Sequence, residues 1–162
     1  TDPYGSDKLK NLNASNAAAQ AFRNASPNSN VGKIATYQEA AEDYYALRDD
    51  LTDARRELKA FNESYDGRTS EEIAEDIAAL DPNDPDYDAD RDALAEELKE
   101  ASDFEDERME LADDVRDVRR ETLFASKDAE QAFYQASKGS SLTPQALSEF
   151  HSNLGLPTLA RK

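Results

Sequence analysis

Cysteine is absent from this chain of 162 residues, histidine occurs once, and the five glycines are scattered. Without cysteine there is no disulfide and no thiolate for catalysis. A single histidine, His151, excludes the paired Glu-x-x-His motifs of four-helix di-metal sites and leaves no poised base for a nucleophilic triad. Scattered glycines supply no phosphate-binding loop. We therefore expect a non-enzymatic protein with no catalytic residues, no cofactor and no metal site, and a surface or interface role for His151.

Long apolar runs are also missing, so we expect no membrane-spanning helix. No signal peptide is recognisable. Because the first residue is Thr1 rather than Met, removal of an N-terminal signal, anchor or tag stays open, and the sequence leaves the localisation unknown.

The formal net charge of −17 is concentrated in the middle of the chain. Residues 67–117 contain twenty-one acidic and five basic residues, whereas residues 1–34 and 118–162 each have a small basic excess. Such a charge repels nucleic acids and anionic membranes and attracts cations or basic proteins. We therefore expect no direct nucleic-acid binding and favour a basic protein partner. An acid-enriched proteome from a saline habitat is the alternative explanation.

Apolar residues recur at steps of three and four through two acidic stretches. The first series is Ile34, Tyr37, Ala41, Tyr44, Leu47, Leu51, Ala54, Leu58, Phe61 and Tyr65, and the second runs from Leu94 to Ala129. This spacing places one apolar stripe on a helix, along which helices pack together. Successive three-residue steps break the strict heptad and favour bent helices over a regular rod. We predict an all-α fold, either a long antiparallel helical hairpin or a small elongated helical bundle with coiled-coil-like seams.

The first long helix is predicted over residues 36–65. Thr36 opens a capping-box pattern, and Gly67 is suited to the left-handed position that ends a helix. A short helix is predicted over residues 70–80, with Thr69 in the spacing of a second capping box.

The second long helix is predicted over residues 88–136, because Pro82 and Pro85 stop the short helix before it. A last short helix has Thr143 as its N-cap and Gly155 beyond its end. The two long helices should pack antiparallel.

Three regions follow from these patterns. Residues 1–33 are expected to be a flexible Asn/Ser/Ala-rich arm with a short helix around residues 13–24. Residues 34–138 form the acidic helical hairpin or bundle, and residues 139–162 a short C-terminal helix and tail.

The seam predicts a set of buried side chains: Leu51, Leu58, Phe61, Leu98, Leu111, Val115 and Val118. The second long helix exceeds the first in length, so part of its apolar surface needs another cover. That part lies around Leu123, Phe124, Phe133 and Tyr134. We predict a partner site or self-association there, with Phe124, Phe133 and Tyr134 as contact residues.

Acidic residues form a second stripe, one residue before the apolar one. The members predicted to bind a partner are Asp103, Glu107, Glu110, Asp114 and Asp117. Neighbouring carboxylates at this spacing repel each other, so local helix energetics oppose the stripe. The competing hypotheses are a solvated face and a recognition surface for a basic partner.

Alternating aspartates between Asp84 and Asp92 are similar in spacing to a calcium loop. Arg91 stands where that loop needs glycine for its sharp turn, so we interpret the segment as an acid-rich helix start. Low-affinity divalent-cation binding is kept as an alternative function.

The leading hypothesis is a helical interaction protein, acting as a structural, scaffold or adaptor component of a larger assembly or envelope. The alternative is an acidic decoy or chaperone-like binder of a basic partner. The tyrosines along the first seam allow a further hypothesis, an aromatic binding patch.

Overall fold

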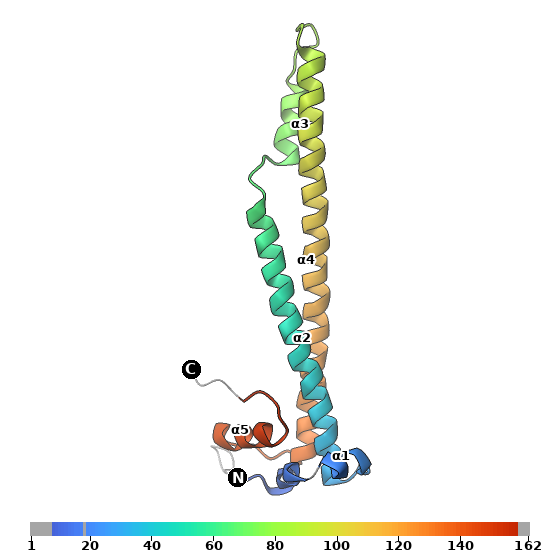
Figure 1. The fold of residues 1–162 in the computed structure, drawn as a ribbon, viewed down its shortest axis with the longest axis vertical. Coiled ribbons are helices and arrows are strands. Elements are labelled where there is room, and N and C mark those ends of the chain that lie inside the picture. Colours follow the sequence, from blue (N-terminus) through green and yellow to red (C-terminus); the bar gives the residue numbers. More distant parts are fainter. Residues whose placement is uncertain (1–7, 18, 159–162) are drawn as a thin grey trace. The chain divides into compact units, whose positions relative to one another are not determined.

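The computed structural model describes residues 8–17 and 19–158, and it is 79% helical. Its elements in chain order (Figure 1) are the 3₁₀ helix η1 (Lys10–Asn16), α1 (Ala19–Asn24), α2 (Asn30–Ser64), α3 (Ser70–Ala78), α4 (Tyr87–Ser137) and α5 (Pro144–Asn153). The described residues include no β-strand, and the long pair α2 and α4 confirms the predicted all-α class. No helix within these ranges combines the length and apolarity needed to cross a membrane.

Helices α2 and α4 pair antiparallel along their seams. Tyr37 of α2 meets Phe133 of α4 with ring centroids 5.4 Å apart. Further along α2, the Leu47 carbonyl accepts a hydrogen bond from the Thr122 hydroxyl of α4 at 3.3 Å. Residue numbers therefore fall on α4 as they rise on α2, which is the antiparallel order that we predicted.

The start of α2 differs from the prediction. The Ser29 hydroxyl accepts the backbone N–H of Gly32 at 3.0 Å, which is the N-cap interaction expected of Thr36. Thr36 lies inside the helix and donates to the Gly32 carbonyl at 3.0 Å. The predicted cap was wrong because a threonine hydroxyl can also bond to the preceding helical turn. Gly32 permits the earlier start, since a side chain there would collide with the Ser26 carbonyl.

The turn after α2 is closed by a tyrosine. Tyr65 donates its hydroxyl hydrogen to the Arg68 carbonyl at 2.6 Å, and its ring lies against Gly67. Gly67 does not have the left-handed conformation that we predicted; among the described glycines that conformation belongs to Gly139 and Gly155. Gly67 leaves room for the Tyr65 ring, which would have to shift to make space for a Cβ atom at this position.

Two predicted helix caps are confirmed. Thr69 accepts the Glu72 N–H at 3.2 Å, and Thr143 accepts the Ala146 N–H at 3.2 Å. After α5, Gly155 has a φ of +69°, as predicted for a residue that ends a helix.

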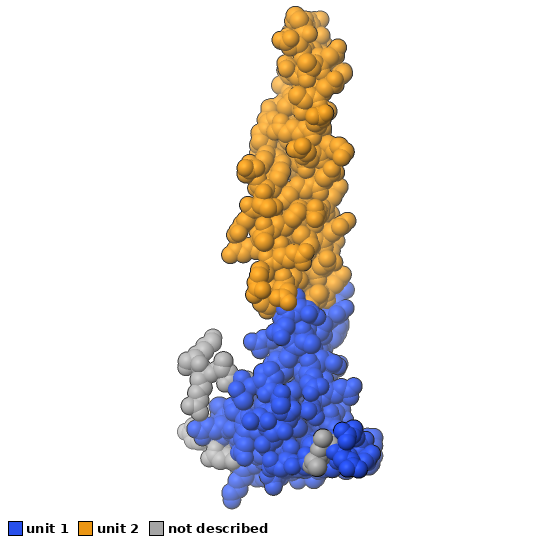
Figure 2. Space-filling view, in the orientation of Figure 1, with its two compact units in different colours: residues 1–50, 119–162 blue, residues 51–118 orange. Residues whose placement is uncertain are grey.

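Two compact units divide the fold (Figure 2). Unit 1 comprises residues 1–50 and 119–162, and unit 2 comprises residues 51–118. Both long helices contribute to each unit; η1, α1 and α5 belong to unit 1, and α3 to unit 2. Described residues from both terminal regions belong to unit 1, and the boundaries predicted after residues 33 and 138 stay a prediction.

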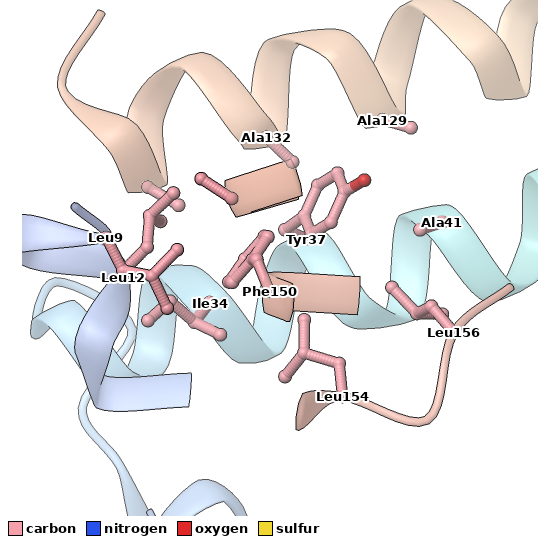
Figure 3. Packing of buried hydrophobic residues seen from close by; sticks show 12 residues of the cluster. Leu9, Leu12, Ile34, Tyr37, Ala41, Ala129, Ala132, Phe150, Leu154 and Leu156 are labelled. Atoms are coloured by element: carbon pink, nitrogen blue, oxygen red, sulfur yellow. The ribbon is translucent and has the colours of Figure 1, made fainter. Parts of the chain in front are cut away.

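Unit 1 has a core built from several elements. Its buried apolar residues are Leu9, Leu12, Ile34, Tyr37, Ala41, Ala129, Ala132, Ala136, Ala146, Phe150, Leu154 and Leu156. Figure 3 shows Phe150 of α5 beside Tyr37 of α2, with Leu12 and Ile34 close by. Phe150 has no exposed surface and stacks on Tyr37 at a centroid distance of 5.5 Å.

Part of the segment expected to be a flexible arm contributes to this core. Leu9 and Leu12 are buried, and the Asn153 amide of α5 donates to the Ser15 hydroxyl of η1 at 3.1 Å. The helix predicted around residues 13–24 occurs as two pieces, η1 and α1; Ala18 between them lies outside the described residues, as do residues 1–7 and 159–162.

Unit 2 buries far fewer side chains. Its buried apolar residues are Leu51, Ile73 and Ala101. Of the seven predicted core residues only Leu51 is buried, and the prediction was wrong for the others, which are half-buried: Leu58, Phe61, Leu98, Leu111, Val115 and Val118. Two helices cover each other along one line only, so most seam positions stay half-exposed where no third element adds cover.

Candidate interaction site

The most buried polar contact of unit 1 joins α2 to α5 and to the segment after it. The Tyr37 hydroxyl lies 2.6 Å from His151 Nε2, and His151 Nδ1 lies 2.8 Å from the Pro157 carbonyl oxygen. Because a carbonyl only accepts, Nδ1 carries the hydrogen, and a neutral imidazole accepts the Tyr37 hydroxyl hydrogen at Nε2. A surface position for His151, one of the two that we predicted, is wrong, since only 3% of this residue is exposed. The residue lies at the contact between α5 and α2.

The polar groups of this contact are engaged with each other and with the backbone. Burial, with a smaller effect of Tyr45, raises the pKa of the Tyr37 hydroxyl above its ordinary value, so the hydroxyl stays protonated near neutral pH. Both ring nitrogens of His151 have partners, so neither is placed to take a proton from a third group.

An aromatic hollow of about 460 Å³ lies beside this pair. Its lining consists of Tyr37, Ala41, Tyr44, Tyr45, Arg48, Ser126, Ala129, Glu130, Phe133, Leu147 and His151. Burial and the neighbouring Tyr44 raise the pKa of the Tyr45 hydroxyl, which keeps the aromatic wall uncharged. Tyr37, Tyr44 and Tyr45, which belong to the hypothetical aromatic patch, line this hollow. Ligand binding there stays a prediction.

The three predicted apolar contact residues have different surroundings. Phe133 is half-buried and packs edge-on against Tyr37, so it belongs to the core side of α4. Tyr134 is exposed and its ring lies near Gly139, in the turn that ends α4. Phe124 is exposed, as is its neighbour Leu123, and its side chain lines a groove. The structure therefore does not bring Phe124, Phe133 and Tyr134 into one patch.

The groove beside Phe124 lies between α2 and α4 of unit 1 and has a volume of about 440 Å³. We call it the acid-rimmed groove, and its lining residues are Asp43, Ala46, Leu47, Asp50, Glu121, Phe124, Ala125 and Asp128. Each helix contributes an acid, two apolar residues and a second acid, at positions i, i+3, i+4 and i+7. None of the four carboxylates forms an ion pair with a described residue.

The acidic stripe predicted for partner binding lies on the part of α4 in unit 2. Its five members are exposed: Asp103, Glu107, Glu110, Asp114 and Asp117. Asp103 pairs with Lys99 at 3.2 Å, and the other four have no ion pair within the described ranges. The stripe and the apolar contact residues thus belong to different units.

Other carboxylates of unit 2 hold its helices together. Arg68 pairs with Asp76 of α3 and forms two hydrogen bonds with Glu97 of α4, at 2.9 and 3.0 Å. Ser70 donates to Glu105 from its hydroxyl at 2.7 Å and from its backbone N–H at 3.1 Å. These bonds lower the pKa values of Glu97 and Glu105 because they favour the charged carboxylates.

The aspartates before α4 serve the backbone of their own turn. Asp81 accepts the Asn83 N–H at 2.9 Å, and Asp84 accepts the Asp86 N–H at 2.9 Å. In the described part of the chain, no group of three or more acidic or histidine side chains is arranged to hold a metal ion. Divalent-cation binding stays a prediction from the sequence.

Comparisons with protein-family models, with curated proteins and with solved structures gave no significant match.

Sequence reasoning missed the acid-rimmed groove, although its signal is present. Asp43 and Asp50 flank an apolar pair at a spacing of seven, and so do Glu121 and Asp128. The prediction concentrated on residues 103–117 because the acids are densest there. Tyr37 and His151 are 114 positions apart, and no local pattern marks their contact.

Proposed function

We propose that this chain is a non-enzymatic helical interaction protein, a structural or adaptor component of a larger assembly or envelope. The observation that carries the proposal is the exposure of two consecutive large apolar residues, Leu123 and Phe124, at 56% and 58%. They lie in the unit with the well-formed core, and Phe124 continues into the acid-rimmed groove. Large apolar side chains left exposed beside a groove fit a protein-contact surface.

A binder of basic proteins is the second candidate. It is favoured by the exposed acidic stripe, where Glu107, Glu110, Asp114 and Asp117 lack ion pairs with described residues. Attraction by such a surface would raise the rate of association more than the final affinity.

Site-specific photo-cross-linking tests the interaction function. A photoreactive residue replaces Leu123 in the full chain, and the matched control carries it at the exposed Lys59. We expect irradiation in cells that make the protein to give one discrete adduct from position 123 and none from position 59. An adduct with the mass of a dimer would identify a second copy of this chain as the partner. No adduct from position 123, or the same products from both positions, would contradict the proposal.

A further inference from the structure

We propose that the acid-rimmed groove is the docking site for a basic amphipathic α-helix of a protein partner. This inference rests on the proposed interaction function and names the chemistry of the partner. It is carried by three features of the groove: its apolar floor, the arrangement of its carboxylates and the lack of a cation in its lining.

The floor of the groove is apolar and accessible. Ala46 and Phe124 are exposed, and Leu47 and Ala125 are half-buried. A partner that covered this floor would remove apolar surface from water, most of it on the Phe124 ring.

The carboxylates are arranged at the two ends of the floor. The hydrogen bond from Thr122 to Leu47 fixes the antiparallel register in this part of unit 1. That register gives each end one carboxylate from each helix: Asp43 with Asp128, and Asp50 with Glu121. Like charges that face each other repel, and a cation placed between them would relieve the repulsion.

The spacing of the carboxylates selects a helical partner. Seven residues of an α-helix span about 10 Å, so the two acidic ends are separated by about that distance. A partner helix with Lys or Arg seven residues apart and two apolar residues between them, at i+3 and i+4, would place a cation at each end and apolar side chains on the floor. The partner's pattern thus matches the pattern of each groove helix, with basic residues in place of acidic ones.

The charge of the groove argues for a basic partner. No lysine or arginine is among the lining residues, and the four carboxylates have no ion pair with a described residue.

Fluorescence anisotropy with a designed probe tests the inference. The probe is a labelled peptide of about 18 residues, long enough to form a helix, with Lys seven residues apart and a Leu pair between them. One control peptide carries Glu in place of Lys, and another has the Leu residues moved to the opposite helix face. We expect the full chain to bind the probe and neither control peptide.

Matched protein variants separate the groove from general charge attraction. The groove variant combines Asp43→Asn, Asp50→Asn, Glu121→Gln and Asp128→Asn. The stripe variant removes the same number of charges with Glu107→Gln, Glu110→Gln, Asp114→Asn and Asp117→Asn. At about 0.15 M salt we expect the groove variant to bind the probe at least about tenfold more weakly than the unmodified chain, and the stripe variant less than about threefold more weakly.

A second pair of matched variants tests the apolar floor of the groove. Phe124→Ala should weaken probe binding about tenfold, whereas Met109→Ala, at a similarly exposed position outside the groove, should leave it unchanged. Both side chains are mostly exposed, so both variants should keep the helix content of the unmodified chain in circular dichroism.

The outcomes distinguish this inference from the function on which it rests. No probe binding, or equal weakening in the groove and stripe variants, would overturn the basic-helix inference. A discrete adduct from position 123 would in that case still support the interaction function. Groove-dependent probe binding without any such adduct would support the docking chemistry and contradict the interaction function.

Discussion

The two units of this chain use the same apolar spacing with different results. In unit 1 the seam residues Ile34, Tyr37 and Ala41 are buried. In unit 2 the equivalent seam positions Leu58, Phe61 and Leu111 stay half-exposed. The difference comes from additional elements, because η1 and α5 cover the helix pair in unit 1 and contribute Leu12 and Phe150 to its core. A helical seam thus defines a contact line, and the number of packed elements decides whether that line becomes a core.

The largest expected effect comes from removing the central side chain of the unit 1 core. Phe150→Ala should lower the free energy of unfolding by about 3–5 kcal/mol, because it leaves a cavity where no surface was exposed. Leu111→Ala in unit 2 should cost only about 1–2 kcal/mol, since that side chain is already half-exposed. Chemical denaturation measures the unfolding free energy of both variants. Equal losses would contradict the conclusion that unit 1 has a better-covered core than unit 2.

Within unit 2, the covered position should behave like a core residue. Ile73 of α3 has no exposed surface, so Ile73→Ala should cost about 2–5 kcal/mol. Leu58→Ala on α2 is the matched control and should cost clearly less. A larger loss of unfolding free energy for Leu58→Ala than for Ile73→Ala would contradict the role of α3 in providing the buried position of this unit.

The buried polar contact of unit 1 should be moderately stabilising. Tyr37→Phe leaves His151 Nε2 without its donor in a buried site, and we expect a loss of about 1–3 kcal/mol. Tyr44→Phe, at a half-buried tyrosine in the same hollow, is the control and should be close to neutral. A neutral Tyr37→Phe would show that the hydrogen bond contributes nothing to unit 1.

Acid should weaken unit 2 through two specific carboxylates. The pKa values of Glu97 and Glu105 are lowered in the folded state, so their stabilising bonds are fully present above the unfolded pKa of about 4.3 and are lost as the pH falls through the folded values. The double variant Glu97→Gln, Glu105→Gln should therefore be less stable than the unmodified chain at pH 7, and the gap should close below about pH 4. Thermal unfolding at a series of pH values measures the difference in stability between the two proteins. A difference that does not change with pH would contradict the stabilising role of the two charged carboxylates.

The smallest effect is expected from the exposed acidic stripe. The stripe variant described above removes the repulsion of Glu107 with Glu110, Glu110 with Asp114, and Asp114 with Asp117. Each relieved pair should add about 0.2–0.5 kcal/mol to the stability of the helix. Glu63→Gln is the control and should give no gain, because Glu63 lies 3.9 Å from Lys59 as an opposite-charge neighbour. A stability loss in the stripe variant would mean that these carboxylates have favourable partners.

The sequence by itself determined the helical class, the two long helices, the antiparallel order and the caps at Thr69 and Thr143. These features depend on local spacing and on backbone groups within a few residues, which the chain order specifies directly. Only the tertiary structure decided which seam positions are buried, because burial depends on elements such as η1 and α5 that arrive from distant parts of the chain. It also decided the Tyr37–His151 contact and the acid-rimmed groove, since each needs two segments more than seventy residues apart to be brought together.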